Sequence, residues 1–286
     1  MADIVLGQHQ MLKKEFVDKR IRGLIGHNFK ADFLFTSTTI NALSGKYYED
    51  ADKDANGRQA YDDVPQVGEN ARFDRIGLSE VEKTFLIKKY GLETVISLEQ
   101  QKFGGEGYYE RAYRKLALNV LKMVDTMAYE VATNKYTVGN GILGKNSAKW
   151  TTADILIGEL VDAKVASSVY GYELDTVVAN PLVMATLLKT KDIRDAFRQN
   201  NTDVALLRGY IGDFMGLTFI QDENFVGKDV LLVQKKVIGE IADAEGLRTK
   251  VYSEEAEDRT IVRATRYTQA YLTDPKAVYL LKAVIA

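Results

Sequence analysis

The chain has 286 residues, of which 38 are basic and 40 acidic, so its formal net charge is -2. This balance gives no overall basic signature for nucleic-acid binding, and 46% hydrophobic with 27% charged residues excludes a disordered tail and fits one or two globular units. The absence of cysteine excludes disulfides, thiolate zinc sites and thiol nucleophiles. We see neither a secretion signal nor the ~18-residue apolar run of a membrane span, so we expect a soluble protein with no membrane partner.

The N-terminal segment, residues 8–25, carries apolar residues at helical spacing from Met11 to Ile21. The spacing predicts a short amphipathic helix. Two roles are open at this point: the helix can be an arm that packs on a neighbouring subunit, or it can pack on its own domain.

Residues 45–80 are polar and rich in turn-forming residues, and residues 72–98 alternate between apolar and charged side chains. The alternation predicts a long hairpin with its turn at Gly91. Few apolar side chains are available to close this hairpin, and a hairpin alone is marginally stable in water. We therefore expect it to lie against another surface, which can belong to another subunit.

The strongest helix signal runs from Glu106 to Tyr136, where apolar residues recur every three or four positions. At 1.5 Å per residue this helix would be ~46 Å long, which is long for a globular protein. Its opposite face is too polar for a membrane.

The region that follows predicts an α/β module with its own core. Residues 139–149 read as a glycine-rich loop, and Thr151 or Thr152 is expected to cap a helix that runs to about Ser168. The next expected elements are a buried strand at 176–179 ended by Asn180-Pro181, helices at 182–189 and 192–198, and strands at 217–221 and 230–235.

The end of the chain, from Lys250, is rich in strand signals. Residues 260–271 alternate, with Val262, Ala264 and Arg266 on one side. A turn is expected at Asp274-Pro275, and a final strand at 277–285. The apolar stripe of the long helix is expected to pack on these closing strands around Val262, Ala264 and Val278.

One glycine motif suggests phosphate binding. The stretch from Gly139 to Gly144 fits G-x-G-x-x-G, and with Lys145 it nearly fits a phosphate loop, although Asn146 stands where a hydroxyl should bind magnesium. That chemistry needs a strand before the loop and a helix that begins within it. A long helix precedes this loop instead, so an inter-domain turn is the favoured interpretation.

An acidic loop resembles the first half of a calcium site. Asp52, Asp54 and Asn56 occupy ligand positions, but Asp63 replaces the usual bidentate Glu and Pro65 follows where a helix should start. A solvated acidic turn is favoured, and calcium binding stays open.

The remaining polar clusters have ordinary explanations. His9 and His27 are the only histidines, and neither lies near an acid–serine constellation. A carboxylate run (Glu254, Glu255, Glu257 and Asp258) is more typical of a solvated turn than of a glycosidase pair. A basic helix face (Arg111, Arg114, Lys115 and Lys122) can meet DNA, be solvated, or pair with Glu110 and other acids. We therefore predict no catalytic, cofactor-binding or metal-binding residues, and no cofactor.

The order of these elements resembles the major capsid protein of tailed bacteriophages, whose fold is called HK-ninety-seven-like. The stretches that carry the resemblance are Val81 to Leu98, Val177 to Pro181, Gly212 to Leu217, and Val262 to Val278. The resemblance implies an α+β fold with an N-terminal arm (1–40), an extended loop (41–98), a peripheral domain with a spine helix (99–145), an axial α/β domain (146–249) and returning peripheral strands (250–286).

The same resemblance implies a structural, non-enzymatic protein that self-assembles, as hexamers and pentamers, into the icosahedral or prolate head around the phage genome. It implies assembly in the host cytoplasm and a final location in the virion. The implied partners are a portal protein and packaged double-stranded DNA, and binding of a decoration protein stays open. The alternatives are an encapsulin-like compartment shell and an α/β enzyme.

Two departures from the family bear on partners and chemistry. The 30–40 residues before the extended loop are too few for a built-in scaffold, so we expect a separate scaffolding protein. Some relatives cross-link subunits through Lys and Asn with a Glu. Lys83, Lys88 and Lys89 lie near the loop, but no such trio can be matched here, so cross-linking stays open.

Overall fold

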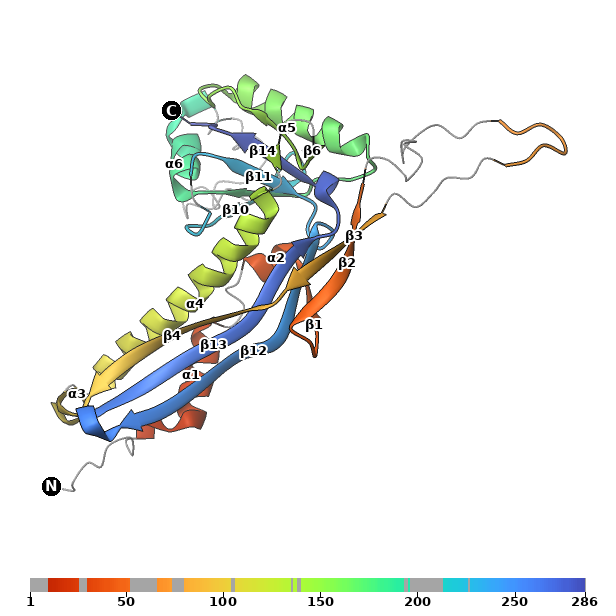
Figure 1. Cartoon of the computed structure of the whole chain (residues 1–286). Coiled ribbons are helices and arrows are strands. Elements are labelled where there is room, and N and C mark those ends of the chain that lie inside the picture. Colours follow the sequence, from red (N-terminus) through yellow and green to blue (C-terminus); the bar gives the residue numbers. More distant parts are fainter. Residues whose placement is uncertain are drawn as a thin grey trace. The chain divides into compact units, whose positions relative to one another are not determined.

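The computed structural model describes residues 10–25, 30–51, 66–73, 80–103, 106–134, 136–137, 140–192, 195, 213–225 and 227–285 (Figure 1). The chain divides into two compact units. The first comprises Met1–Leu43, Leu86–Glu130 and Ile241–Ala270, and the second comprises Ser44–Phe85, Val131–Glu240 and Tyr271–Ala286. Among the described residues, no helix combines the length and the apolar character that a membrane crossing requires.

The first unit is built on a four-stranded sheet in the order β1-β12-β13-β4. Its elements are η1 (Gln10–Leu12), α1 (Lys14–Ile25), α2 (Ala31–Leu34), β1 (Thr36–Thr39), β4 (Lys88–Ser97), α3 (Leu98–Phe103), α4 (Glu106–Asn134), β12 (Gly239–Glu254), η2 (Glu255–Glu257) and β13 (Arg259–Leu272). The last residues of α4 and β13 and the first two of β12 fall in the second unit.

The long predicted helix is α4, and it lies along the four-stranded sheet (Figure 1). Its apolar stripe, which includes Tyr113 and Leu116, forms one buried cluster with Val262 and Ala264 of β13. This packing confirms the predicted helix and the predicted contact with those two strand residues. A helix of this length is stabilised mainly by such burial of one face rather than by intrinsic propensity.

The N-terminal helix packs on its own unit. Val17 and Ile21 of α1 are fully buried in the same cluster as Leu116. The Tyr113 hydroxyl donates to the Met11 carbonyl over 2.6 Å and ties the start of the segment to α4. Of the two roles left open by the sequence, packing on its own domain is the one that the structure shows.

The alternation along β13 has the predicted sidedness. Val262, Ala264 and Arg266 are all buried. Arg266 is tolerated there because its guanidinium makes two hydrogen bonds to Asp243 of β12, at 3.0 and 2.7 Å. A buried charge that is paired and hydrogen-bonded avoids most of the desolvation cost of an isolated one.

The predicted turn at Gly91 is wrong. Gly91 lies inside β4, paired with Thr265 in the antiparallel ladder between β4 and β13. A Cβ at this position would lie 2.8 Å from Thr265 Cγ2 and 3.0 Å from the Ala264 carbonyl oxygen. The glycine therefore marks a close approach of two strands, which in sequence looks the same as a turn.

The second unit contains a six-stranded sheet in the order β7-β14-β11-β8-β10-β9, and two pairs, β2-β3 and β5-β6. Its elements are β2 (Ser44–Asp50), β3 (Glu80–Leu86), β5 (Tyr136–Thr137), β6 (Asn140–Gly141), β7 (Leu143–Asn146), α5 (Ala153–Ser168), β8 (Thr176–Ala179), α6 (Pro181–Lys189), β9 (Asp213–Phe214), β10 (Leu217–Gln221), β11 (Val230–Val233), η3 (Pro275–Ala277) and β14 (Val278–Lys282).

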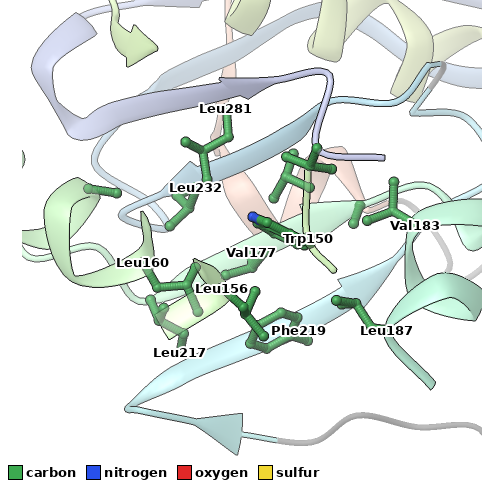
Figure 2. Packing of buried hydrophobic residues seen from close by; sticks show 14 of the residues in the cluster. Trp150, Leu156, Leu160, Val177, Val183, Leu187, Leu217, Phe219, Leu232 and Leu281 are labelled. Atoms are coloured by element: carbon green, nitrogen blue, oxygen red, sulfur yellow. The ribbon is translucent and has the colours of Figure 1, made fainter. Parts of the chain in front are cut away.

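The core of the six-stranded sheet confirms the predicted α/β module. Figure 2 shows Leu156 and Leu160 of α5 packed with residues of the central strands, among them Val177 and Phe219. All four residues of β8 are buried, as expected for a central strand flanked on both sides. Asn180 ends the strand and caps α6, since its side chain accepts from the Leu182 amide over 2.9 Å.

Three further expectations need correction. The hairpin arms are β2 and β3, which pair with each other, rather than the two halves of residues 72–98. The glycine-rich loop contains the short strands β6 and β7. The closing strands begin at Gly239, inside the range expected for the axial domain, and the final strand pairs with β11 and β7 rather than with the peripheral strands.

The final strand also corrects one expected contact of the long helix. Val278 was expected beside Val262 and Ala264, but it lies opposite Val233 in the six-stranded sheet. The helix expected at 192–198 falls mostly outside the described residues.

Candidate assembly surfaces

The β2–β3 hairpin is held by a cluster of three aromatic rings. The rings of Tyr47 and Phe85 each lie 4.6 Å, centroid to centroid, from the ring of Tyr271 at the end of β13. Phe85 and Tyr271 are nearly parallel, at 19°. Stacked pairs of this kind contribute beyond their buried area. The hairpin is therefore fixed at its base by residues from both of its strands.

Gly45 makes this stacking possible. A Cβ on Gly45 would lie 2.6 Å from the ring of Phe85, closer than real side chains approach. The ring of Phe85 covers the backbone of β2 at this point, an arrangement that compensates a glycine in an edge strand. A side chain larger than hydrogen at position 45 would push Phe85 out of the stack.

Tyr271 is also held by a carboxylate. Its hydroxyl donates to Glu240 over 2.5 Å. Burial raises the pKa of Tyr271, and the hydrogen bond and the negative charge of Glu240 raise it further. The pKa of Tyr47 is raised by burial and by the charge of Glu49. Both tyrosines therefore stay neutral at physiological pH.

The hairpin strands are joined by two ion pairs. Lys83 binds Glu49 over 2.7 Å, and Lys46 binds Glu82 over 2.5 Å. The first is the better shielded, because the Glu49 side chain is only 10% exposed. Lys83 is thus engaged within its own chain, whereas Lys89 lies over the ring of Tyr267 at 5.6 Å. These contacts do not decide whether subunits are cross-linked.

The basic face of α4 points to solvent. Arg111, Arg114, Lys115 and Lys122 are all exposed. Arg111 donates to the Gly107 carbonyl of the preceding turn. Glu110, considered as a partner for this face, instead binds Arg20 of α1 over 2.7 Å. The face is solvated within the chain and remains open to a partner.

The glycine motif has no phosphate-binding geometry among its described residues. Gly141 and Gly144 lie on β6 and β7, and the next helix, α5, begins only at Ala153. Lys145 binds Asp162 of α5 over 2.8 Å. No helix N-terminus faces these glycines, so the amides that would hold a phosphate are not gathered here.

A buried carboxylate that the sequence did not reveal organises the connection from β7 to α5. Glu159 accepts from the Ala148 amide and from Trp150 Nε1, each over 2.7 Å, and also from the Ser147 hydroxyl. Three donors satisfy this carboxylate, which is only 6% exposed as a residue. Its position suits a structural role, because it fixes the chain that enters α5.

The carboxylate run lies at the turn between β12 and β13. Arg259 binds Glu254 over 2.6 Å and also binds Glu257. Within the described part of the chain, no group of three or more His, Asp or Glu residues is placed to hold a metal ion. His9, His27 and the loop from Asp52 to Asp63 lie outside the described residues, so neither proposal for them is tested.

The fold is shared with chains from a virus-like particle and from phages. The match to a chain of a virus-like particle from Pyrococcus furiosus covers 94% of this chain and 98% of that chain, with a TM-score of 0.64 and 13% sequence identity. The match to a chain of Mycobacterium phage Che8 covers 93% of this chain and 92% of that chain, with a TM-score of 0.63 and 11% sequence identity. The match to a chain from the capsid of cyanophage P-SCSP1u covers 89% of this chain and 88% of that chain, with a TM-score of 0.64 and 11% sequence identity. These likenesses define the class of the fold.

The sequence carries the more specific assignment. Residues 80–281 match the phage capsid protein family, and the chain belongs to that family. It is a structural protein of the phage capsid, it is located in the virion, and its copies form a shell. No curated protein matches the sequence. The matched range begins at the first residue of β3 and includes all of β3, α4 and most of both large sheets, whereas β1 and β2 lie before it.

Proposed function

We propose that this chain is the major capsid protein of a tailed phage, which assembles in the host cytoplasm as pentamers and hexamers that close into an icosahedral or prolate head around double-stranded DNA. In this proposal α4 is the spine helix of the peripheral domain, β2 and β3 form the extended loop, and the six-stranded sheet is the core of the axial domain. The protein acts by assembly and catalyses no reaction.

The β2–β3 hairpin is the observation that carries the proposal. It is a two-stranded pair held to its unit by three aromatic rings and crossed by one exposed ion pair, Lys46–Glu82, and one shielded pair, Lys83–Glu49. Tyr48 and Val81 on its strands are about half exposed. A pair of strands without a third is marginal alone. Symmetric assembly supplies many weak, repeated contacts that can cover such a surface.

The proposal is tested by negative-stain electron microscopy of the purified chain at high concentration. We expect closed particles, and we expect deletion of residues 62–80 to leave a folded chain that makes none. Normal shells from the deletion variant would contradict the role of the hairpin. A monomer that forms no particles under any condition would contradict the function itself and favour an α/β enzyme.

A separate scaffolding protein and a portal protein complete the proposal, and a decoration protein is a further possible partner. Expression of the chain alone is expected to give mis-sized or open particles, and co-expression with the scaffolding protein uniform ones. Uniform, correctly sized shells from the lone chain would contradict the need for a scaffold.

An encapsulin-like compartment is the second candidate, and the similarity of fold to a virus-like particle supports keeping it. The two differ in cargo. Particles purified from the native source should contain nucleic acid and one portal ring if the chain forms a phage head, and a packaged enzyme if it forms a compartment.

A further inference from the structure

Helix α5 carries apolar residues on both of its faces. Leu156, Leu160 and Ala163 are fully buried in the core of the six-stranded sheet. Val161 and Val165 lie on the opposite face, and Val169 follows directly after the last helical residue at the same four-residue spacing. These three residues are 41%, 58% and 68% exposed. We call these three residues the valine ridge. The helix also carries charged residues, among them Asp162, so the ridge is a narrow apolar stripe beside a charged flank. Apolar side chains that are exposed together on one face are candidates for contact with another protein.

The ridge is shaped for contact with another protein surface. Valine in a helix has essentially one side-chain rotamer, so little side-chain entropy is lost when it is covered. One turn before the ridge, Gly158 has open space where a Cβ would be. Small residues beside an apolar stripe allow another backbone to come close.

The charges around the ridge do not favour a nucleic acid. Lys145 binds Asp162, and Lys164 donates to the Met215 carbonyl over 2.6 Å. Both lysines are thus already engaged within the chain, and the valine side chains offer no donor to a phosphate. Phosphate neutralisation dominates protein–DNA affinity, so DNA is a poor occupant.

The size of the ridge indicates the kind of partner. Three valines at these exposures present on the order of 200 Å² of apolar surface, well under the roughly 800 Å² per partner of a stable two-body complex. Such a contact is too small to hold a separate binding protein alone. It is adequate as one of several contacts that repeat around a ring of identical subunits, where weak interfaces reinforce one another.

We propose that the valine ridge of each subunit packs against a neighbouring copy of this chain in the shell. The inference rests on the proposed function, since it requires that the chain assembles. It adds which face of the α/β module is covered on assembly, and the geometry of a closed ring makes the contact heterologous, with the ridge facing a different patch of the next copy.

The chain lacks cysteine, so a single introduced thiol reports on one position without background. In Val165→Cys we expect rapid maleimide labelling of the unassembled subunit and at least tenfold slower labelling of the assembled shell. Ala163→Cys on the buried face of the same helix is the control, and it should react slowly in both states.

Equal labelling of Val165→Cys in subunits and shells would overturn the inference while leaving the shell function intact. Protection that appears only when a different protein is added would also overturn it. Failure of the unaltered chain to form any particle would overturn the proposed function, and the inference with it.

A charged substitution gives a second test. In Val165→Glu the shell yield should fall at least tenfold at matched concentration, because a carboxylate would be buried without a partner. The melting temperature of the unassembled subunit should stay unchanged, because the position is more than half exposed there. Val165→Thr keeps the shape and should still assemble. Normal yield from Val165→Glu would contradict the inference.

Discussion

Helices α4 and α5 each bury one apolar face, but their opposite faces differ in chemistry. The outer face of α4 carries Arg111, Arg114, Lys115 and Lys122, all exposed, and one exposed leucine, Leu118. Such a mainly charged face is the ordinary surface of a helix that is packed on one side. The outer face of α5 carries the valine ridge. We infer that the packing of α4 is complete within one chain, whereas the exposed apolar surfaces of α5 and of the β2–β3 hairpin are covered only on assembly.

The buried face of α4 offers the largest effect. Leu116 is 2% exposed and lies in the cluster with Val262 and Ala264, so Leu116→Ala should cost about 2–5 kcal/mol in the free energy of unfolding. Shell yield should fail before the isolated chain unfolds completely, because the loss recurs in every subunit. Chemical denaturation and particle yield measure the two effects.

Met123 on the same helix is the matched control for Leu116. It is only partly buried against the cluster, so Met123→Ala should cost clearly less than Leu116→Ala. Equal costs would show that the stripe is not packed as described.

The buried face of α5 depends on Glu159. In Glu159→Ala, the Ala148 amide and Trp150 Nε1 lose their acceptor, at about 1–3 kcal/mol for each donor left unpaired. Glu159→Gln keeps the size and one acceptor oxygen, so it should lose less stability. Thermal unfolding and the fluorescence of the single tryptophan, Trp150, report the change. An unchanged melting temperature and fluorescence in Glu159→Ala would mean that Glu159 does not fix the connection from β7 to α5.

The base of the hairpin should be sensitive to alkaline pH. The pKa of Tyr271 is raised by burial and by Glu240, so the folded state keeps its proton longer than the unfolded state does. Stability from this group is fully present below the unfolded pKa of about 10 and is lost as pH rises above it. Tyr271→Phe should cost about 0.5–1.5 kcal/mol at neutral pH, through the lost hydrogen bond, and flatten the decline above pH 10. An unaltered alkaline profile in Tyr271→Phe would contradict this assignment.

The smallest effect is expected at Lys145. Its ion pair with Asp162 is largely exposed, so Lys145→Ala should change stability by about 0–1 kcal/mol and leave assembly intact. The same variant tests the glycine motif. ATP hydrolysis by the unaltered chain that disappears in Lys145→Ala would overturn the structural interpretation of that loop.

Elements with strong local patterns could be predicted from the sequence. The helix expected at 106–136 is α4, and the strand at 176–179 is β8 with the expected boundaries. Both elements have a clear local pattern of apolar residues. The pattern of α4 fits a helix that buries one face, and that of β8 fits a strand that is buried on both faces. The sequence patterns also led to the fold class, because the order of such elements was itself informative.

Pairings between distant segments could not be predicted in the same way. Gly91 suggested a turn because close approach to Thr265, 174 positions away, leaves the same local signature. The neighbours of β14 in the sheet, β7 and β11, are set by how the whole module folds and not by the local sequence of β14.

The assembly surfaces were the least visible in the sequence. The stack of Tyr47, Phe85 and Tyr271 joins segments more than 180 residues apart. The sequence predicted the helix that carries Val161 and Val165, but it gave no sign that the valine ridge is exposed. Alternation around Phe85 was the one local hint of the hairpin, and it was assigned to the wrong pair of strands.

Hydrogen exchange on unassembled subunits and on shells tests the central distinction most directly. The account predicts that amides of α4, residues 106–134, are protected in both states, whereas those of β2 and β3 gain protection only in the shell. If the hairpin amides exchange at the same rate in both states, assembly does not cover the hairpin, and the account is contradicted. Unprotected α4 amides in both states would contradict the fold itself.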